Sequence, residues 1–386
     1  MAERNLLTVI VPTRERPDTL FHCLKTITNQ TDPRLEIIVS DNCSAPETKA
    51  VVDSFQSDSR LRYIRPSSRL GMSEHWEFAL NQVQGNWVTF IGDDDGLLPG
   101  AVEKFFDLIK GKDVKAVSTN SCKFWWSNPE KNIPSKLTVQ TERGIEVRST
   151  KEWLLKVLNA QENFQTLPYI YTGGFMNIDT IHDIKRKSDG AFFRSITPDA
   201  YSGIAACLVL DSYLFSWEPL ALAGLSKHSN GHQQMTWRKE DPKKISFFSE
   251  SSLGFHPKLG NGIVQSVPML LYEAFLRASP LYKEDLGVNI EDQLSISIAY
   301  AEKTRQKEAY EYCEQVSKEN GIDFSVVLKK LPAIKLKRKI SKIKKNLSRA
   351  FLPHRKDKNL KISGDAGLNN IYDAAQKADA VLKKLA

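Results

Sequence analysis

Three consecutive aspartates, Asp93, Asp94 and Asp95, follow an apolar run in the stretch VTFIGDDDGLLPGA. Adjacent carboxylates repel each other by roughly 1 kcal/mol at 4 Å in water, and by more where solvent is excluded. A divalent cation makes such a cluster favourable, because Mg2+ and Mn2+ take oxygens from one or two protein carboxylates and from substrate phosphates. The chemistry this suits is departure of a phosphate or diphosphate. Solvated loops and calcium sites can carry the same triplet, so the spacing alone does not decide.

The elements that position these acids are predicted by the pattern of the first 110 residues. Apolar strands are expected at 6–11, 35–42 and 86–92, with a short strand at 61–66 and amphipathic helices between them. Strands that are buried on both faces and alternate with helices predict an α/β fold with a mostly parallel sheet. Ligands of such sheets bind beyond the carboxyl ends of the strands. This rule places Thr13, Asp41 and the aspartate triplet at one edge.

Composition restricts the class of protein. The chain has 386 residues, of which 41% are hydrophobic and 26% charged, as in a protein with a sizeable core. No stretch approaches 18 uninterrupted apolar residues, and the amino-terminal residues lack the features of a secretory signal. The five cysteines are odd in number and widely spaced, which predicts neither a disulfide framework nor a zinc site. We expect a cytoplasmic protein.

Positive charge is concentrated near the carboxyl end. Leu328–Lys358 contains thirteen Lys or Arg and one acid, a local net charge of +12. This exceeds the net charge of +8 for the whole chain, so the rest of the chain is mildly acidic. Pro332 and Pro353 are expected to bound this segment. One helical face is apolar and the rest basic, a pattern typical of helices that lie on anionic membranes; the apolar positions are Leu336, Ile340, Ile343, Leu347 and Phe351. The alternative is a solvated helix that packs on the body. Motifs for nucleic-acid readout are absent, so no nucleic-acid partner is expected.

Four stretches together resemble family 2 glycosyltransferases, nucleotide-sugar-dependent enzymes of bacterial type with the GT-A fold. They are TVIVPTRERPDTLFHCLKTITNQ, EIIVSDNCS, GNWVTFIGDDDGLLPGAVEKF and SITPDAYSG. The similarity is strongest over about 5–110, with a second block near 165–230. The resemblance implies a Rossmann-like central sheet flanked by helices, a nucleotide-sugar donor, Mn2+ or Mg2+ as cofactor, and an inverting transfer.

The resemblance over 5–230, together with the helical and charged pattern after about residue 230, predicts an order of segments along the chain. Residues 1–230 would form the GT-A catalytic domain, with the nucleotide sugar bound by about 5–110 and the acceptor by about 111–230. A helical extension (231–327), the basic amphipathic segment (328–358) and a C-terminal helix (359–386) would follow.

The family motifs assign donor-binding residues in this sequence. Pro12 and Thr13 match the end of the first strand, with Arg14 beside them. Asp41, which closes the second strand, would bind the nucleoside base, with Asn42 next to it. Arg69 lies where a basic side chain would meet the diphosphate, although an ordinary surface ion pair is an equal alternative.

The aspartate motif departs from the family pattern. Counting back from Pro99, the usual leading aspartate falls at Gly92 and the metal-binding one at Asp94. We therefore expect Asp94 as the first metal ligand with Asp95 beside it, and Asp93 directed toward the sugar or ribose. Many GT-A enzymes add a late histidine to the metal, which His228 or His232 would supply here; an unpaired surface histidine is the more common outcome.

Asp199 is the candidate catalytic base. Inverting sugar transfer requires one general base that takes a proton from the acceptor hydroxyl as it attacks the anomeric carbon. Pro198 stands where the family often has Glu, so a single carboxylate is available. The alternative is that Asp199 only stabilises a helix start, because Thr197-Pro198-Asp199 reads as a helix N-terminus.

The sequence thus predicts a metal-dependent inverting glycosyltransferase, of hexosyltransferase type, at the inner face of the membrane. It would move a sugar, from a UDP-linked donor in our interpretation, to a glycan or lipid-linked glycan in cell-surface polysaccharide synthesis. A sugar nucleotidyltransferase is less favoured, because VPTRERPDTL has no glycine to cradle phosphates. A non-catalytic membrane-associated scaffold on the same fold is the alternative from another class. The oligomeric state is open.

Overall fold

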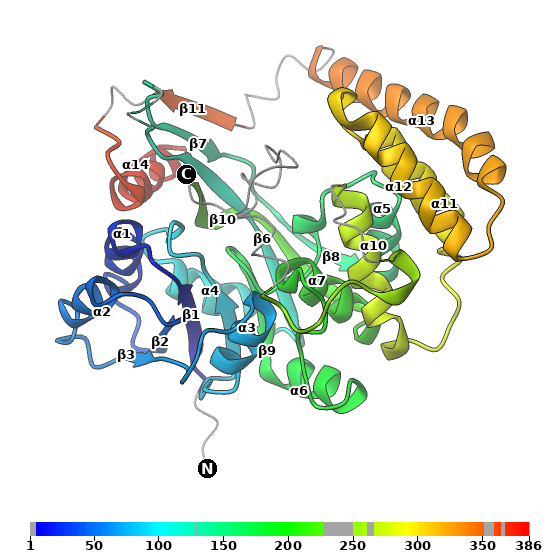
Figure 1. Ribbon diagram of the computed structural model, residues 1–386. Coiled ribbons are helices and arrows are strands. Elements are labelled where there is room, and N and C mark those ends of the chain that lie inside the picture. The colour runs from blue at the N-terminus through cyan, green and yellow to red at the C-terminus, as the bar shows by residue number, and fades with distance from the viewer. Residues whose placement is uncertain are drawn as a thin grey trace.

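One central sheet flanked by helices organises the computed structural model (Figure 1). The structure describes residues 5–128, 130, 132–226, 250–260, 266–350, 359–363 and 367–385, with the backbone alone for 341, 342 and 344–350. Its strands are β1 (Leu7–Thr13), β2 (Leu35–Asp41), β3 (Leu61–Ile64), β4 (Trp87–Phe90), β5 (Gly96–Leu97), β6 (Ala116–Trp125), β7 (Lys136–Gln140), β8 (Ile145–Ser149), β9 (Gly174–Asn177), β10 (Ser212–Leu225) and β11 (Asn359–Ser363). Its helices are α1 (Pro17–Thr28), α2 (Pro46–Asp53), α3 (Met72–Leu80), α4 (Ala101–Ile109), α5 (Thr150–Leu158), α6 (Ile178–Lys187), α7 (Pro198–Val209), α10 (Val267–Ala278), α11 (Ile290–Tyr300), α12 (Gln306–Glu319), α13 (Phe324–Ala350) and α14 (Ile371–Lys384).

The sheet has a parallel part and a mixed part. Its main strand order is β11-β7-β6-β9-β4-β1-β2-β3, and β10 pairs with β5, β6 and β8 outside this path. The strands β3, β2, β1 and β4 are parallel to their neighbours. Beyond them, β9 runs antiparallel to both β4 and β6, while β10 is parallel to β6. The predicted α/β class is confirmed, and the parallel part is the one that the strand and helix pattern of the first 110 residues predicts.

The core lies on both faces of the sheet because successive strand residues point to opposite sides. In β1, Val9 and Val11 pack with α1 and α4 residues, whereas Ile10 between them packs with Trp76 of α3 on the other face. All three β1 side chains are fully buried. This two-sided burial explains why β1 reads as a continuous apolar run in the sequence.

The helices from α10 to α13 form an extension beside α5 and α7. Helix α10 contacts α7, and α11 packs between α10 and α13, as Figure 1 shows on the right of the molecule. Pro332 lies inside α13 and does not begin it. The helix continues through the proline because Val327 and Leu331 are buried against the core.

The chain then returns to the sheet at its carboxyl end. The stretch expected as a C-terminal helix contains a strand, β11, that pairs antiparallel with β7, and then α14. Helix α14 packs on α1, β5 and β7. A Cβ on Gly96 of β5 would lie 3.0 Å from Ile371, so the helix supports the strand that follows the aspartate triplet.

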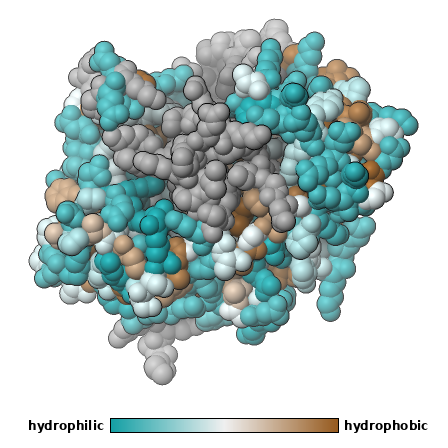
Figure 2. Space-filling view, viewed as in Figure 1, coloured by the Kyte–Doolittle hydropathy of each residue, from teal (hydrophilic) through white to brown (hydrophobic). Residues whose placement is uncertain are grey.

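The outer face of α13 keeps apolar side chains exposed. Leu336, Ile340 and Ile343 retain 57%, 43% and 47% of their accessible surface. Hydrophobic and hydrophilic surface alternate over this part of the molecule in Figure 2. None of the helices in the described ranges combines the length and apolarity that crossing a bilayer requires.

Candidate active site

The carboxyl ends of β1 and β2 meet the aspartate triplet, as the strand pattern predicts. Thr13 and Asp41 are paired in register at the ends of β1 and β2. The Thr13 hydroxyl donates to Asp93 Oδ2 at 2.8 Å, and Arg16 Nη1 lies 2.9 Å from Asp93 Oδ1. Burial raises the pKa of Asp93, Arg16 opposes this shift, and the charge of Asp94 adds to it.

Asp95 is held by three donors. Its Oδ1 accepts the N–H of Gly224 at 2.6 Å, and its Oδ2 accepts the N–H of Gly92 at 3.0 Å and the hydroxyl of Thr172. Burial, followed by the charge of Asp94, raises the pKa of Asp95 to about 7. Among the residues that the structure describes, Oδ1 accepts only the Gly224 N–H, so it keeps a lone pair that could bind a metal without breaking these hydrogen bonds. The three hydrogen bonds anchor the loop in this structure.

Asp94 lies between these two anchored carboxylates. Its Oδ2 accepts the hydroxyl of Ser226 at 2.6 Å, and its backbone oxygen accepts Trp126 Nε1 at 3.1 Å. Strand β10 approaches so closely that a Cβ on Gly224 would lie 1.8 Å from the Asp94 carbonyl oxygen. Only glycine fits at this crossing.

Gly92 occupies the place of the family's leading aspartate for a steric reason. A Cβ there would lie 2.4 Å from the hydroxyl of Tyr171 and 2.9 Å from Asp95 Oδ2. Tyr171 is stacked on Trp76 of α3, so it cannot retreat easily. The departure from the family pattern is thus built into the packing of this chain.

Asp41 organises the edge next to β3. Its side chain is fully buried and accepts the N–H of Ser44 at 2.9 Å, the hydroxyl of Tyr63 at 2.6 Å and Arg65 Nη1 at 3.0 Å. Because Arg65 is partly exposed, this network presents a guanidinium at the edge where a ligand would bind.

Arg14 and Arg69, predicted separately, converge on one carboxylate. Glu250 Oε2 lies 2.7 Å from Arg14 Nη1, and its Oε1 lies 3.2 Å from Arg69 Nη2. The loop that carries Arg69 is fixed by Asn42, whose side chain exchanges two hydrogen bonds with the backbone of Leu70 at 2.8 and 2.9 Å. Two arginines that share one anion form an arrangement suited to a phosphate group.

Asp199 lies in the first turn of α7. Burial raises its pKa, and the N–H groups of Ala200 and of Asp199 itself oppose the shift. Tyr171 links the two groups of acids: its pKa lies well above the usual value because of burial and, to a lesser degree, the charges of Asp95, Asp94, Asp199 and Asp93. Both interpretations of Asp199, a base and a helix-start residue, are compatible with this position.

The predicted histidine ligands cannot be placed. His228 and His232 lie outside the described residues. In the part of the chain that the structure covers, no three or more His, Cys, Asp or Glu side chains are grouped so as to hold a metal ion by themselves.

Comparison with known proteins identifies the region that carries this edge. Glycosyl transferase family 2 matches residues 8–182. This region is a family 2 glycosyltransferase domain. A β-1,3-glucosyltransferase of Campylobacter jejuni that acts on GalNAc(5)-diNAcBac-PP-undecaprenol is 43% identical over 98 residues, which cover 25% of this chain and 32% of that protein. GlyG of Streptococcus pneumoniae is 25% identical over 116 residues, or 30% of this chain and 38% of that protein. The matched segments thus span about a third of these relatives.

Solved structures give a weaker likeness. S. aureus TarS in complex with UDP-GlcNAc aligns with a TM-score of 0.45 and 16% identity, over 86% of this chain and 88% of that chain. The mannosyltransferase PcManGT of Pyrobaculum calidifontis, solved with GDP-Man and Mn2+, aligns with a TM-score of 0.42 and 17% identity, over 83% of this chain and 88% of that chain.

Several partners in the candidate site were missed by the sequence prediction. Arg16 pairs with Asp93, and Thr172 and Gly224 hold Asp95. Arg16 follows the first predicted strand closely, so a basic residue there was a usable signal. Thr172 and Gly224 gave no signal, because their contacts depend on strand pairings that span about 75 to 130 residues of sequence.

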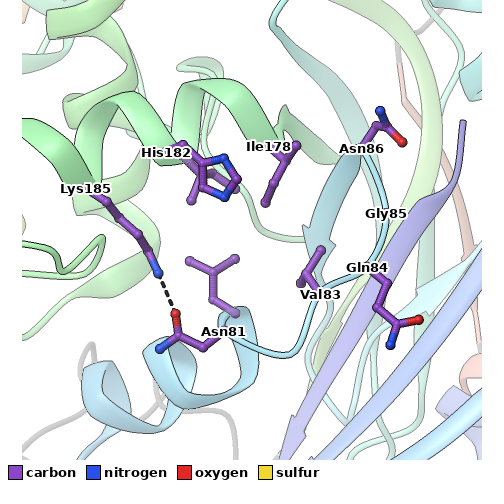
Figure 3. A pocket seen from close by; sticks show the side chains of 10 residues that line it. Asn81, Val83, Gln84, Gly85, Asn86, Ile178, His182 and Lys185 are labelled. Carbon is purple, nitrogen blue, oxygen red and sulfur yellow. Dashed lines mark hydrogen bonds between the residues drawn. The ribbon is translucent and has the colours of Figure 1, made fainter. Parts of the chain in front are cut away.

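A separate cavity of the glycosyltransferase domain lies at the opposite end of β4. It has a volume of about 330 Å3 and is lined by residues 80, 81 and 83–86 and by Ile178, Ile181, His182 and Lys185 of α6. Figure 3 shows Lys185 bonded to Asn81 across this cavity. Because residues 80–86 precede β4, whereas the aspartates follow it, the cavity is not part of the active-site edge.

Proposed function

We propose that this chain is an inverting, metal-dependent glycosyltransferase that moves a sugar from a UDP-sugar to a glycan or lipid-linked glycan. The observation that carries the proposal is the convergence of Thr13, Asp41 and the aspartate triplet at one sheet edge, the edge where α/β proteins bind ligands. Residues 5–110 would bind the donor, and 111–230 would line the acceptor side.

The arginines support a diphosphate on the donor side. Arg14 and Arg69 share the Glu250 carboxylate, and two phosphate oxygens would offer them the same charge at similar spacing. Asp41 and Asn42 would contact the nucleoside beside Pro12 and Thr13. Asp93, already bonded to Thr13, would face the sugar or ribose.

The triplet fits a divalent cation that receives most of its other ligands from substrate and water. The Asp94 charge raises the pKa of both Asp93 and Asp95, and a bound cation would offset this repulsion between the carboxylates. Asp94 would be the first protein ligand, with Asp95 beside it and His228 as a candidate third. When bound, Mn2+ or Mg2+ would neutralise the leaving diphosphate.

Asp199 would act as the general base toward the acceptor. Its raised pKa suits a carboxylate that takes a proton from a hydroxyl. Because no second carboxylate precedes it in the TPDAY motif, inversion would rest on this residue alone.

The basic segment Leu328–Lys358 supports a membrane-proximal acceptor. Leu336, Ile340 and Ile343 are exposed at steps of four and three residues on α13, with basic side chains at most neighbouring positions. Such a helix would lie in an anionic membrane surface, which supports a location at the inner face of the membrane. The Campylobacter jejuni relative acts on an undecaprenol-linked glycan, which agrees with this acceptor class.

Calorimetry with UDP tests the proposal directly. We expect UDP to bind in the presence of Mn2+ and to bind much more weakly in EDTA, because the diphosphate would share the cation with Asp94. A screen of nucleotide sugars for metal-dependent UDP release would then identify the donor. A chain that binds no nucleotide under either condition would support the scaffold alternative.

A further inference from the structure

The turn that leads into α7 is held by carboxylates from two distant helices. Glu77 of α3 accepts the N–H groups of Phe192 and Phe193 at 2.9 and 3.0 Å. Glu273 of α10 accepts the hydroxyl of Ser195 at 2.5 Å. Glu273 is fully buried, and a buried carboxylate is costly unless its partners are well placed. The hydrogen bond between Glu273 and Ser195 therefore offsets part of the cost of burying the Glu273 carboxylate.

Ser195 connects Glu273 to the start of α7. Its Oγ accepts the N–H of Thr197 at 3.3 Å and lies 3.2 Å from the Thr197 hydroxyl, while its carbonyl oxygen accepts the hydroxyl of Ser73 at 2.5 Å. Thr197 precedes the helix, yet its side chain makes no capping hydrogen bond. Ser195 thus provides one attachment of the first turn of α7. Ser202 provides another, since its hydroxyl donates to the Asp199 carbonyl oxygen at 2.7 Å and accepts the N–H of Ile170 at 3.1 Å.

Proline makes this attachment stiff. Pro198 opens α7 and has a fixed φ, and it also restricts the conformation of Thr197 before it. Of the backbone torsions between Ser195 and Asp199, the φ of Pro198 is thereby fixed and those of Thr197 are restricted. A displacement of Ser195 would therefore move the Asp199 carboxylate with it.

Glu273 is itself fixed by a cation. Arg277 Nε donates to Glu273 Oε1 at 3.0 Å, and Arg277 Nη2 donates to the carbonyl oxygens of Leu253 and Gly254 at 3.0 and 3.1 Å. Glu273 is thereby oriented from the side opposite Ser195. The carboxylate cannot rotate away from the turn without breaking an ion pair.

We propose that Glu273 is a positioning residue for sugar transfer: through Ser195 it fixes the turn that places the Asp199 carboxylate against the acceptor. This inference rests on the proposed function, specifically on Asp199 as the base. Glu273 does not act on substrate, but misplacement of a reacting group by about 1 Å can cost roughly 100-fold in rate. The helical extension would thus contribute to catalysis through one buried carboxylate.

The test compares Ser195→Ala and Glu273→Gln with a matched control, Ser295→Ala. Ser295 is also fully buried in the extension and donates to the Val327 carbonyl at 2.8 Å, far from the turn. Release of UDP from UDP-glucose and UDP-N-acetylglucosamine with Mn2+, in which water replaces the acceptor hydroxyl and receives the sugar, gives kcat and KM. Calorimetry gives the Kd for UDP. Hydrogen exchange of the peptide spanning 195–204 reports the turn without any substrate.

We expect both test variants to lower kcat roughly 10- to 100-fold, with KM for the donor and Kd for UDP unchanged, and to speed exchange at 195–204. Ser295→Ala should resemble the wild type. Combined with Asp199→Asn, neither variant should reduce the remaining rate further, because the residue being positioned is gone.

Two results would overturn different claims. If Asp199→Asn keeps normal turnover, or if the wild type releases UDP from neither donor, the proposed function fails while exchange still tests the attachment. If Asp199→Asn is inactive but Ser195→Ala and Glu273→Gln match Ser295→Ala in kcat or in exchange, the positioning role is wrong.

Discussion

The two sides of the aspartate triplet are built from different chemical groups. On the side of β1 and β2, four arginines are paired with carboxylates: Arg16 with Asp93 of the triplet, Arg65 with Asp41, and Arg14 and Arg69 with Glu250. On the side of β10, the partners are neutral: a backbone N–H from Gly224 and hydroxyls from Thr172 and Ser226. The difference indicates that the two sides have different roles. The arginine side can attract an anionic ligand, whereas the neutral side shapes the loop that meets it.

The largest predicted effect is the loss of turnover when Asp94, the proposed metal ligand of the triplet, is replaced. Asp94→Asn should lower turnover roughly a thousandfold, about 4 kcal/mol of transition-state stabilisation, because the first metal ligand loses its charge. The Kd for Mn2+-dependent UDP binding should weaken in parallel. Turnover and calorimetry on the same preparation measure both.

Asp95→Asn is the matched comparison for Asp94→Asn. An amide has one acceptor oxygen, so either the Gly224 or the Gly92 N–H loses its acceptor. We expect a loss of about 1–3 kcal/mol in the free energy of unfolding with a smaller effect on UDP binding. Equal losses of UDP affinity in the two variants would contradict the division between ligand and anchor.

The next prediction concerns stability on the neutral side, where a side chain at position 224 would collide with the backbone of the triplet. Gly224→Ala would place a Cβ 1.8 Å from the Asp94 carbonyl oxygen, in contact with backbone that has no room to move. We expect the free energy of unfolding to fall by about 3 kcal/mol or more, measured by urea denaturation. Gly203→Ala is the control, because its Cβ would meet Tyr169 at 3.1 Å and needs only a small adjustment. Similar stability of the two variants would show that the β10 crossing is not tight.

A third prediction concerns the pH dependence of stability that His75 contributes, next to β2 on the arginine side. His75 is buried and bonded to the Ser40 hydroxyl at 2.8 Å, and burial lowers its pKa to about 4. A histidine with a lowered pKa binds fewer protons folded than unfolded between pH 4 and 6.5. Stability from this group is therefore present above pH 6.5 and is lost as the pH falls toward 4, by up to about 3 kcal/mol.

His75→Gln isolates this contribution from that of the carboxylates. The difference in unfolding free energy between wild type and variant, measured at pH 4, 5, 6 and 7, should shrink or reverse as the pH falls. A difference that stays constant over this range would mean that the imidazole does not change its protonation on folding.

The same two sides explain which parts of the site could be predicted from the sequence. Thr13 and Asp41 were placed correctly at one edge, because parallel strands bring their carboxyl ends together whatever the loops do. Gly224 and Thr172 could not be found, since β10 and residue 172 reach the triplet through tertiary pairing without a periodic signal. Likewise, α14 was expected as a helix, but its contact with β5 depends on the return of β11 to the sheet.

The smallest predicted effect tests whether the Glu250 carboxylate occupies the place that the donor's diphosphate would take on the arginine side. Glu250 is the shared partner of Arg14 and Arg69, and both arginines are partly exposed, so each ion pair is worth at most about 1 kcal/mol. Glu250→Gln frees their charge for the donor's diphosphate, and the Kd for UDP should tighten on the order of 2- to 5-fold by calorimetry. Glu218→Gln, which removes a similarly exposed pair with Lys104, should leave the Kd unchanged. Weaker UDP binding in Glu250→Gln would instead show that Glu250 helps to hold the arginines in place, and the arginine side would then be preformed by this carboxylate before the donor arrives.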